Sequence, residues 1–124
     1  MELRMFISGK ITGEEPKACE AKFEAIEKKL RNIGLQTIIN PLKLGIPPRW
    51  KRQDITDAYR KVLKEQANSL VLLNNWENSF DSRVLRDLAQ ELKYEIFLED
   101  DTDEIADYLR LHKPALGQGY GIRE

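Results

Sequence analysis

Leu70-Val71-Leu72-Leu73 is a wholly apolar run, and the polar stretch Asn74-Asn75-Trp76-Glu77-Asn78-Ser79 follows it directly. A strand that is apolar at every position is covered on both faces, which is typical of the centre of a parallel sheet. Parallel strands are joined by crossovers, usually helices, so the run predicts an α/β domain.

The segments on both sides of this run alternate between strand-like and helix-like patterns. Besides residues 70–73, strands are expected at 3–7, 35–39 and 95–98, and helices at 16–33, 54–67, 80–92 and about 101–112. The prediction is one three-layer, flavodoxin-like or Rossmann-like domain at residues 1–113. Its parallel sheet of four to five strands has helices on both faces. Residues 114–124 contain three glycines and are expected to form a tail.

Particular residues support the predicted helices. In the first helix an apolar stripe recurs at spacings of four, three, four and three: Cys19, Phe23, Ile26, Leu30 and Ile33. Gly34 suits the C-terminal cap of that helix. The apolar face of the third helix is expected to comprise Val84, Leu85, Leu88, Ala89 and Leu92. Asp101 and Glu104 have the spacing of a capping box for the last helix.

Composition narrows the class of protein. The 124 residues carry 20 basic and 21 acidic side chains, and a net charge of −1 argues against dedicated nucleic-acid binding. There is no apolar run of membrane-spanning length, and the chain begins in a strand-like segment rather than a secretion signal. Cys19 is the only cysteine and His112 the only histidine, so neither a disulfide nor a zinc site is predicted. We expect a cytoplasmic protein without a metal or other cofactor.

The predicted architecture selects three loops as a ligand site. In such sheets, ligands bind outside the carboxyl ends of the strands, near the point where the strand order reverses. The loops there are Ser8–Gly13, Asn40–Arg52 and Asn74–Ser82. Their candidate ligand-binding residues, with one from the preceding strand, are Phe6, Ser8, Gly9, Lys10, Gly13, Asn40, Asn74, Trp76, Glu77, Ser79 and Ser82.

Each loop also has a simpler interpretation. The glycines at Ser8–Gly13 allow a ligand to approach the backbone, or they form a plain turn. A basic and aromatic cluster in the second loop could meet a phosphate or simply be solvated: Lys43, Arg49, Trp50, Lys51 and Arg52. In the third loop Trp76 offers a face for stacking a base, and Ser79 or Asp81 could cap the following helix. Glu77 and Asp81 are the carboxylates nearest the expected cleft.

At these loops the sequence resembles the nucleoside 2-deoxyribosyltransferase superfamily, and within it the small uncharacterised bacterial and phage-type members. The resemblance rests on residues 5–13 (MFISGKITG), 39–41 (INP) and 68–79 (NSLVLLNNWENS) continuing to Ala89. It implies a flavodoxin-like sheet, a homo-oligomer and a pocket for a nucleoside or nucleotide-like ligand. The transferases of the superfamily exchange bases on deoxyribose through a covalent glycosyl-enzyme.

The chain departs from this family at the residues that matter for catalysis. The glutamate nucleophile of the family corresponds to Leu85, and leucine cannot attack a sugar carbon. The aspartate at the start of the third strand is Asn68, the glycine-alanine pair is Asp81-Ser82, and the tyrosine of the first strand is Phe6.

The sequence therefore favours a protein that binds a nucleoside, nucleotide or sugar phosphate without transferase chemistry. One alternative is an N-glycoside hydrolase or deoxyribosyltransferase that uses Asp81 as a relocated carboxylate, with Glu77 as its partner. The other alternative is an oligomeric interaction module without a small-molecule ligand.

Overall fold

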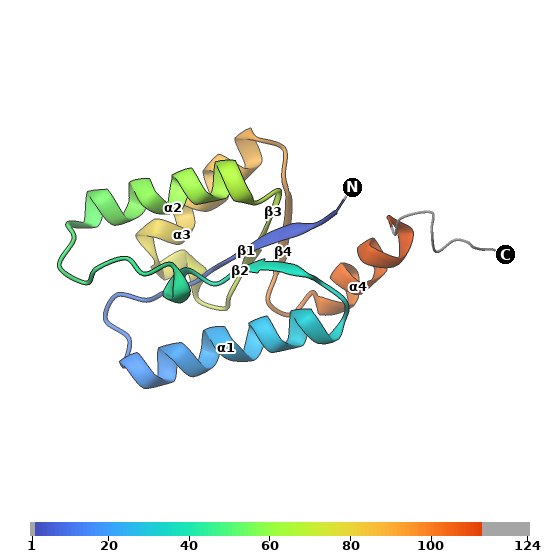
Figure 1. The fold of residues 1–124 in the computed structure, drawn as a ribbon, viewed down its shortest axis with the longest axis horizontal. Coiled ribbons are helices and arrows are strands. Elements are labelled where there is room, and N and C mark those ends of the chain that lie inside the picture. Colours follow the sequence, from blue (N-terminus) through green and yellow to red (C-terminus); the bar gives the residue numbers. More distant parts are fainter. Residues whose placement is uncertain (1, 113–124) are drawn as a thin grey trace, which may run out of the picture.

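A computed structural model describes residues 2–112, and the predicted tail at 114–124 lies outside these residues (Figure 1). The strands are β1 (Arg4–Ser8), β2 (Thr37–Ile39), β3 (Ser69–Leu72) and β4 (Glu95–Leu98). The helices are α1 (Pro16–Asn32), α2 (Arg52–Gln66), α3 (Phe80–Glu91) and α4 (Thr102–Leu111). Two short 3-10 turns, η1 (Pro41–Lys43) and η2 (Trp76–Asn78), follow β2 and β3.

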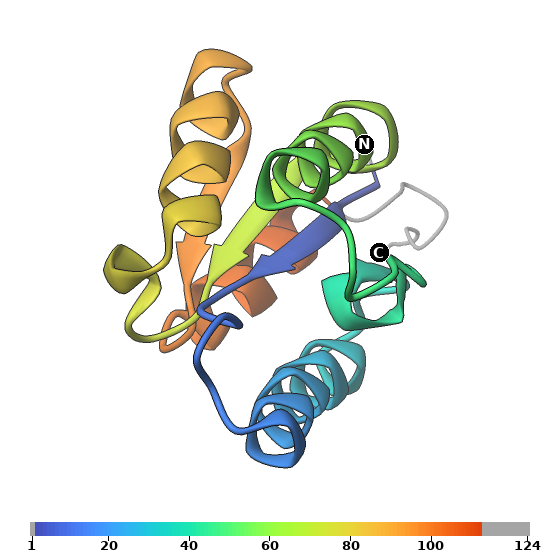
Figure 2. The same ribbon diagram turned by 90° about the vertical axis from the view of Figure 1, so that its left-hand side faces the viewer.

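All pairs of neighbouring strands in the four-stranded sheet are parallel, and the strand order is β2-β1-β3-β4. Helices α2 and α3 cover one face, and α1 and α4 cover the other (Figure 2). The predicted three-layer α/β class is confirmed. The chain moves from β1 outward to β2 and then returns to the other side of β1 as β3, so the strand order reverses between β1 and β3.

Strand β1 shows how the sheet distributes its side chains between the two layers. Met5 and Ile7 belong to the core shared with α1 and α4, whereas Phe6 belongs to the core shared with α2 and α3. Because side chains alternate along a strand, Ser8 lies on the same face as Phe6. The last residue of β1 is therefore directed towards α2 and α3.

Two local expectations about helix ends have opposite outcomes. Gly34 follows α1 with a φ of +108°, as the predicted C-terminal glycine should. The predicted capping box at Asp101 is wrong, because the Asp101 side chain makes no cap hydrogen bond to α4. It accepts a hydrogen bond instead from the backbone N–H of Leu98 at 2.9 Å, which closes the turn between β4 and α4.

The apolar face predicted for the third helix is correct at its centre and wrong at its end. Leu85 and Ala89 are fully buried, and Leu88 packs against the same core. Leu92 is 37% exposed, because α3 ends at Glu91 and Leu92 is its C-cap. Val84 is half-buried and belongs to neither core.

Within residues 2–112, no helix has the length and apolar composition needed to cross a bilayer. Cys19 of α1 is buried in the core between the sheet and helices α1 and α4, as its place on the apolar stripe predicts.

Candidate functional site

Polar side chains meet at the carboxyl edge of the sheet, where the strand order reverses. Ser8 ends β1, and its Oγ lies 2.8 Å from Oγ of Ser82 in the first turn of α3. Both serines are buried, at 4% and 0% exposure. The structure thus brings together two predicted ligand-binding residues, and their hydroxyls fasten the start of α3 to the end of β1.

Asp81 directly precedes Ser82 in the sequence, and its carboxylate contacts helix α2. Thr56 donates a hydrogen bond from Oγ1 to Oδ1 of Asp81 at 2.5 Å. Among residues 2–112, the second carboxylate oxygen of Asp81 has no hydrogen-bond partner. Half-buried Asp81 is therefore oriented through one oxygen, while the other remains available as an acceptor.

Helix α2 is the part of the site that sequence reasoning missed. Besides the Thr56 contact, the Arg52 guanidinium lies over the Phe80 ring at 4.8 Å, so two residues of α2 contact the start of α3. Thr56 and Tyr59 are three residues apart and share the buried face of α2 with Leu63. Polar residues on an otherwise apolar stripe were the signal available in the sequence.

Tyr59 fills the space between α2 and β1. It is only 7% exposed, and its ring packs edge-on against Phe6 with centroids 6.0 Å apart. Burial first, and then the nearby Asp81 carboxylate, raise the pKa of Tyr59 to about 12. Phe6, a predicted ligand-binding residue, is itself fully buried, so its side chain is not exposed at this edge of the sheet.

The residues of the first loop have structural reasons for their identity. A Cβ on Gly9 would lie 2.9 Å from the Leu73 Cβ, so close packing of β1 and β3 requires glycine there. Gly13 has a φ of +83°, a conformation that favours glycine. Lys10 forms an ion pair with Glu14 at 3.8 Å.

The second loop separates into unrelated parts. Asn40 is buried, and its side chain accepts from the Leu42 N–H at 3.0 Å and donates to Glu27 at 3.2 Å. Lys43 pairs with Glu27 and Glu24 on α1, whereas Arg52 stacks on Phe80. Arg49, Trp50 and Lys51 are exposed. The predicted basic cluster is therefore divided, because Lys43 contacts α1 and Arg52 contacts the start of α3.

Glu27 is a buried carboxylate held by three donors. Arg31 Nη2 lies 2.9 Å from Oε2, and Lys43 Nζ and Asn40 Nδ2 lie 3.1 Å and 3.2 Å from Oε1. Burial alone would raise the pKa of Glu27, but the hydrogen bonds from Arg31, Asn40 and Lys43 outweigh it and hold the pKa below its ordinary value.

Removing the Glu27 charge is expected to destabilise the domain near neutral pH. Because the folded-state pKa of Glu27 is lowered, its contribution is present above the unfolded-state pKa and is lost as pH falls through the folded-state pKa. We expect Glu27→Gln to cost roughly 1–3 kcal/mol at pH 7, with the difference from wild type vanishing at acidic pH. Urea unfolding at pH 7, 5 and 3 measures this.

Glu24→Gln is the matched control, since Glu24 contacts the same Lys43 from a side chain that is 60% exposed. It should change the free energy of unfolding by less than about 0.5 kcal/mol. Equal losses for the two variants at pH 7 would contradict the role given to burial.

The third loop holds Trp76 and Glu77 on the surface near α3. The Trp76 ring is half-buried, and the Arg86 guanidinium lies 5.1 Å from its centroid. The side chain of Glu77 is exposed, and its backbone carbonyl accepts a hydrogen bond from Arg83. Arg86 thus already occupies a stacking position on the tryptophan predicted to receive a base.

The other two candidates of this loop have intramolecular partners. Ser79 caps α3 by accepting a hydrogen bond from the Ser82 N–H at 3.2 Å, so the cap is Ser79 rather than Asp81. The backbone N–H of Asn74 donates to Glu99 at 2.8 Å.

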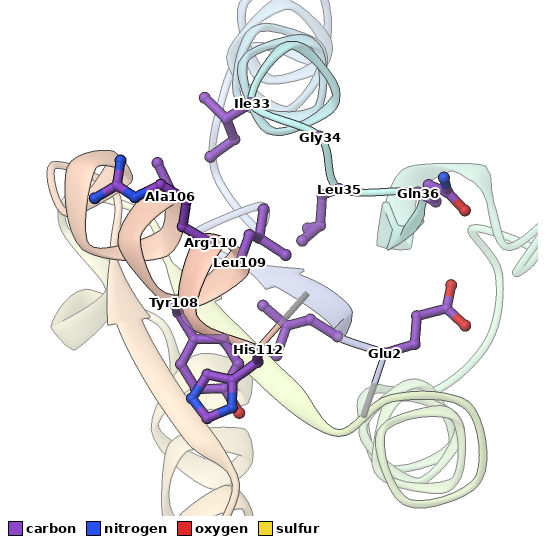
Figure 3. A pocket seen from close by; sticks show the side chains of 11 residues that line it. Glu2, Ile33, Gly34, Leu35, Gln36, Ala106, Tyr108, Leu109, Arg110 and His112 are labelled. Atoms are coloured by element: carbon purple, nitrogen blue, oxygen red, sulfur yellow. The ribbon is translucent and has the colours of Figure 1, made fainter. Parts of the chain in front are cut away.

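A cavity of about 530 Å³ lies at the opposite, amino edge of the sheet (Figure 3). Apolar side chains dominate its lining, and Leu35 and Leu109 face each other within it. Its polar side chains include Arg110, which pairs with Asp107, and His112, which stacks on Tyr108 with centroids 4.1 Å apart. None of the predicted ligand-binding residues lines this cavity, so it is separate from the polar cluster at the carboxyl edge. Within residues 2–112, no three His, Cys, Asp or Glu side chains are grouped as a metal site would need.

The fold and the polar cluster define a flavodoxin-like α/β domain whose candidate site lies at the carboxyl edge between β1 and β3. The chain belongs to the family described as domain of unknown function DUF4406, whose model matches residues 3–98. The match includes Ser8, Thr56, Tyr59, Asp81 and Ser82 and ends before α4. Comparisons with curated proteins and with solved structures gave no match.

Proposed function

We propose that this domain binds a nucleoside, a nucleotide or a related sugar phosphate at the carboxyl edge between β1 and β3, without the transferase chemistry of the superfamily that it resembles. The observation that carries the proposal is the contact of α3 with both β1 and α2, through Ser8–Ser82 and Thr56–Asp81. These contacts place polar groups where sheets of this topology bind ligands. The resemblance in the loops after β1 and β3 supports the same class of ligand.

Leu85 speaks against transferase chemistry in this domain. This residue stands where the superfamily carries its nucleophile, and it is fully buried in the core between the sheet and α2 and α3. Its packing accounts for its identity without any catalytic role.

Thermal unfolding with a panel of deoxynucleosides, nucleotides and sugar phosphates tests the proposal. A ligand present at 100 times its dissociation constant stabilises the folded state by about 2.7 kcal/mol. We expect at least one class of probe to raise the melting temperature. Unchanged melting with every class would contradict the proposal.

The Asp81→Asn variant should lower the affinity for the ligand while changing the free energy of unfolding only slightly. Asparagine retains an oxygen that can accept from Thr56, so the free energy of unfolding should fall by about 1 kcal/mol or less. Loss of the charged acceptor should weaken binding of the active probe about tenfold, because charge-assisted hydrogen bonds are the stronger ones. Calorimetric titration measures the affinity, and Glu91→Gln, at an exposed carboxylate at the end of the same helix, is the control.

A second candidate function is hydrolysis or transfer at an N-glycosidic bond with Asp81 as the carboxylate. The observation favouring it is that Thr56 orients one oxygen of Asp81 while the other is left unpartnered within the described chain. Incubation with deoxynucleosides, followed by chromatography of the free base, tests it beside Asp81→Asn. Release by the wild type that disappears in the variant would support hydrolysis, and equal or absent release would contradict it.

The homo-oligomer implied by the resemblance is part of the same proposal. Light scattering of the purified protein over a range of concentrations tests it, and a monomer at every concentration would contradict it.

A further inference from the structure

Tyr59 is a buried residue whose hydroxyl has no hydrogen-bond partner within residues 2–112. The ring is held against Phe6, and Thr56, one helical turn earlier, is bonded to Asp81. Buried hydroxyls are almost always hydrogen-bonded, so an unpaired one needs an explanation. Tyr59 shares the buried face of α2 with Thr56, and the Asp81 charge is near enough to act on the Tyr59 hydroxyl.

Tyr94 provides the comparison within the same domain. Its hydroxyl lies 3.2 Å from the Leu63 carbonyl and 3.4 Å from the Lys64 carbonyl, at the other end of α2. One tyrosine packed against α2 therefore has backbone acceptors for its proton, and the tyrosine within α2 has none among the described residues. The Tyr59 hydroxyl is therefore available as a hydrogen-bond donor, and the second carboxylate oxygen of Asp81 is available as an acceptor.

We propose that Tyr59 and Asp81 together bind a sugar hydroxyl of the ligand, with Tyr59 donating a hydrogen bond to the hydroxyl oxygen and Asp81 accepting a hydrogen bond from the hydroxyl. The inference rests on the proposed function and deepens it by naming the part of the ligand that is recognised. A hydroxyl both donates and accepts, so it satisfies both groups at once. A free base has no hydroxyl for this position, and the Asp81 charge disfavours a phosphate there. Burial, and then the Asp81 charge, raise the pKa of Tyr59 to about 12, so the phenol stays protonated as a donor.

The test compares two single variants, Tyr59→Phe and Tyr94→Phe. The probes are 2′-deoxynucleosides and the corresponding free bases. For Tyr59→Phe we expect deoxynucleoside affinity to fall about tenfold, with the affinity for free bases unchanged. The melting temperature without ligand should stay level or rise, because no intramolecular hydrogen bond is lost. For Tyr94→Phe we expect unchanged affinity and a melting temperature lower by about 4 °C.

The outcomes separate this inference from the proposed function. A wild-type protein that binds deoxynucleosides together with a Tyr59→Phe variant of equal affinity would overturn the role of Tyr59 and leave the proposed function standing. A fall in melting temperature for Tyr59→Phe as large as for Tyr94→Phe would show a structural hydrogen bond and also overturn it. A wild-type protein that binds no sugar-containing probe would overturn both.

Discussion

Replacing Leu85 with glutamate is expected to unfold the domain at neutral pH. Leu85 is 0% exposed and packs in the core formed by the sheet with α2 and α3. Loss of a buried leucine costs about 2–5 kcal/mol, and burial of an unpaired carboxyl adds roughly 1–3 kcal/mol more. That sum is comparable with the whole stability of a small domain, about 5–15 kcal/mol.

Circular dichroism and urea unfolding measure this loss, with two controls that isolate its cause. Leu85→Met keeps the volume and should cost less than about 1.5 kcal/mol. Gln90→Glu places the same charge on an exposed position of α3 and should cost less than about 1 kcal/mol. A Leu85→Glu variant as stable as these controls would show that the position tolerates a carboxylate and would remove the structural argument against a nucleophile there.

Gly9→Ala is expected to destabilise the domain by about 1–3 kcal/mol through a clash between neighbouring strands. The new Cβ would lie 2.9 Å from both Cβ and Cδ1 of Leu73. Leu73 is fully buried, and its N–H donates to the Ser8 carbonyl at 2.8 Å, so neither its side chain nor its backbone can withdraw freely. Thermal and urea unfolding of the purified variant measure the loss.

A double-mutant cycle with Leu73→Ala tests whether the clash is the cause. Leu73→Ala alone should cost about 2–5 kcal/mol. Because it removes the contacts with Cγ and Cδ1 of Leu73 but keeps Cβ, it relieves part of the clash, and the double variant should cost less than the sum of the two single changes. Gly13→Ala is the control, because its Cβ would meet nothing within 4 Å and only its positive φ carries a cost, about 1–2 kcal/mol. Additive losses for Gly9 and Leu73 would contradict a clash with the Leu73 atoms beyond Cβ.

The sequence by itself determined the α/β class, the succession of strands and helices, and the edge of the sheet that carries the polar loops. The apolar run at Leu70–Leu73 and the stripe from Cys19 to Leu30 suffice for this, because burial on one or both faces is recorded in the spacing of apolar residues along each element. Side-chain alternation along β1 also follows from the sequence. These features depend on short-range patterns.

Only the tertiary structure decided which polar groups meet. Thr56 and Asp81 are 25 residues apart and Ser8 and Ser82 are 74 apart, so no local pattern relates either pair. The sequence alone does not distinguish a serine that faces a ligand from one paired with another serine. It also does not show that Asn40, a predicted ligand-binding residue, bonds to Glu27 and Leu42. Tyr59 was absent from the prediction because its importance depends on α2 packing beside α3. Hydrogen bonds between elements depend on their relative placement in the folded sheet, which is a property of the whole core rather than of any one segment.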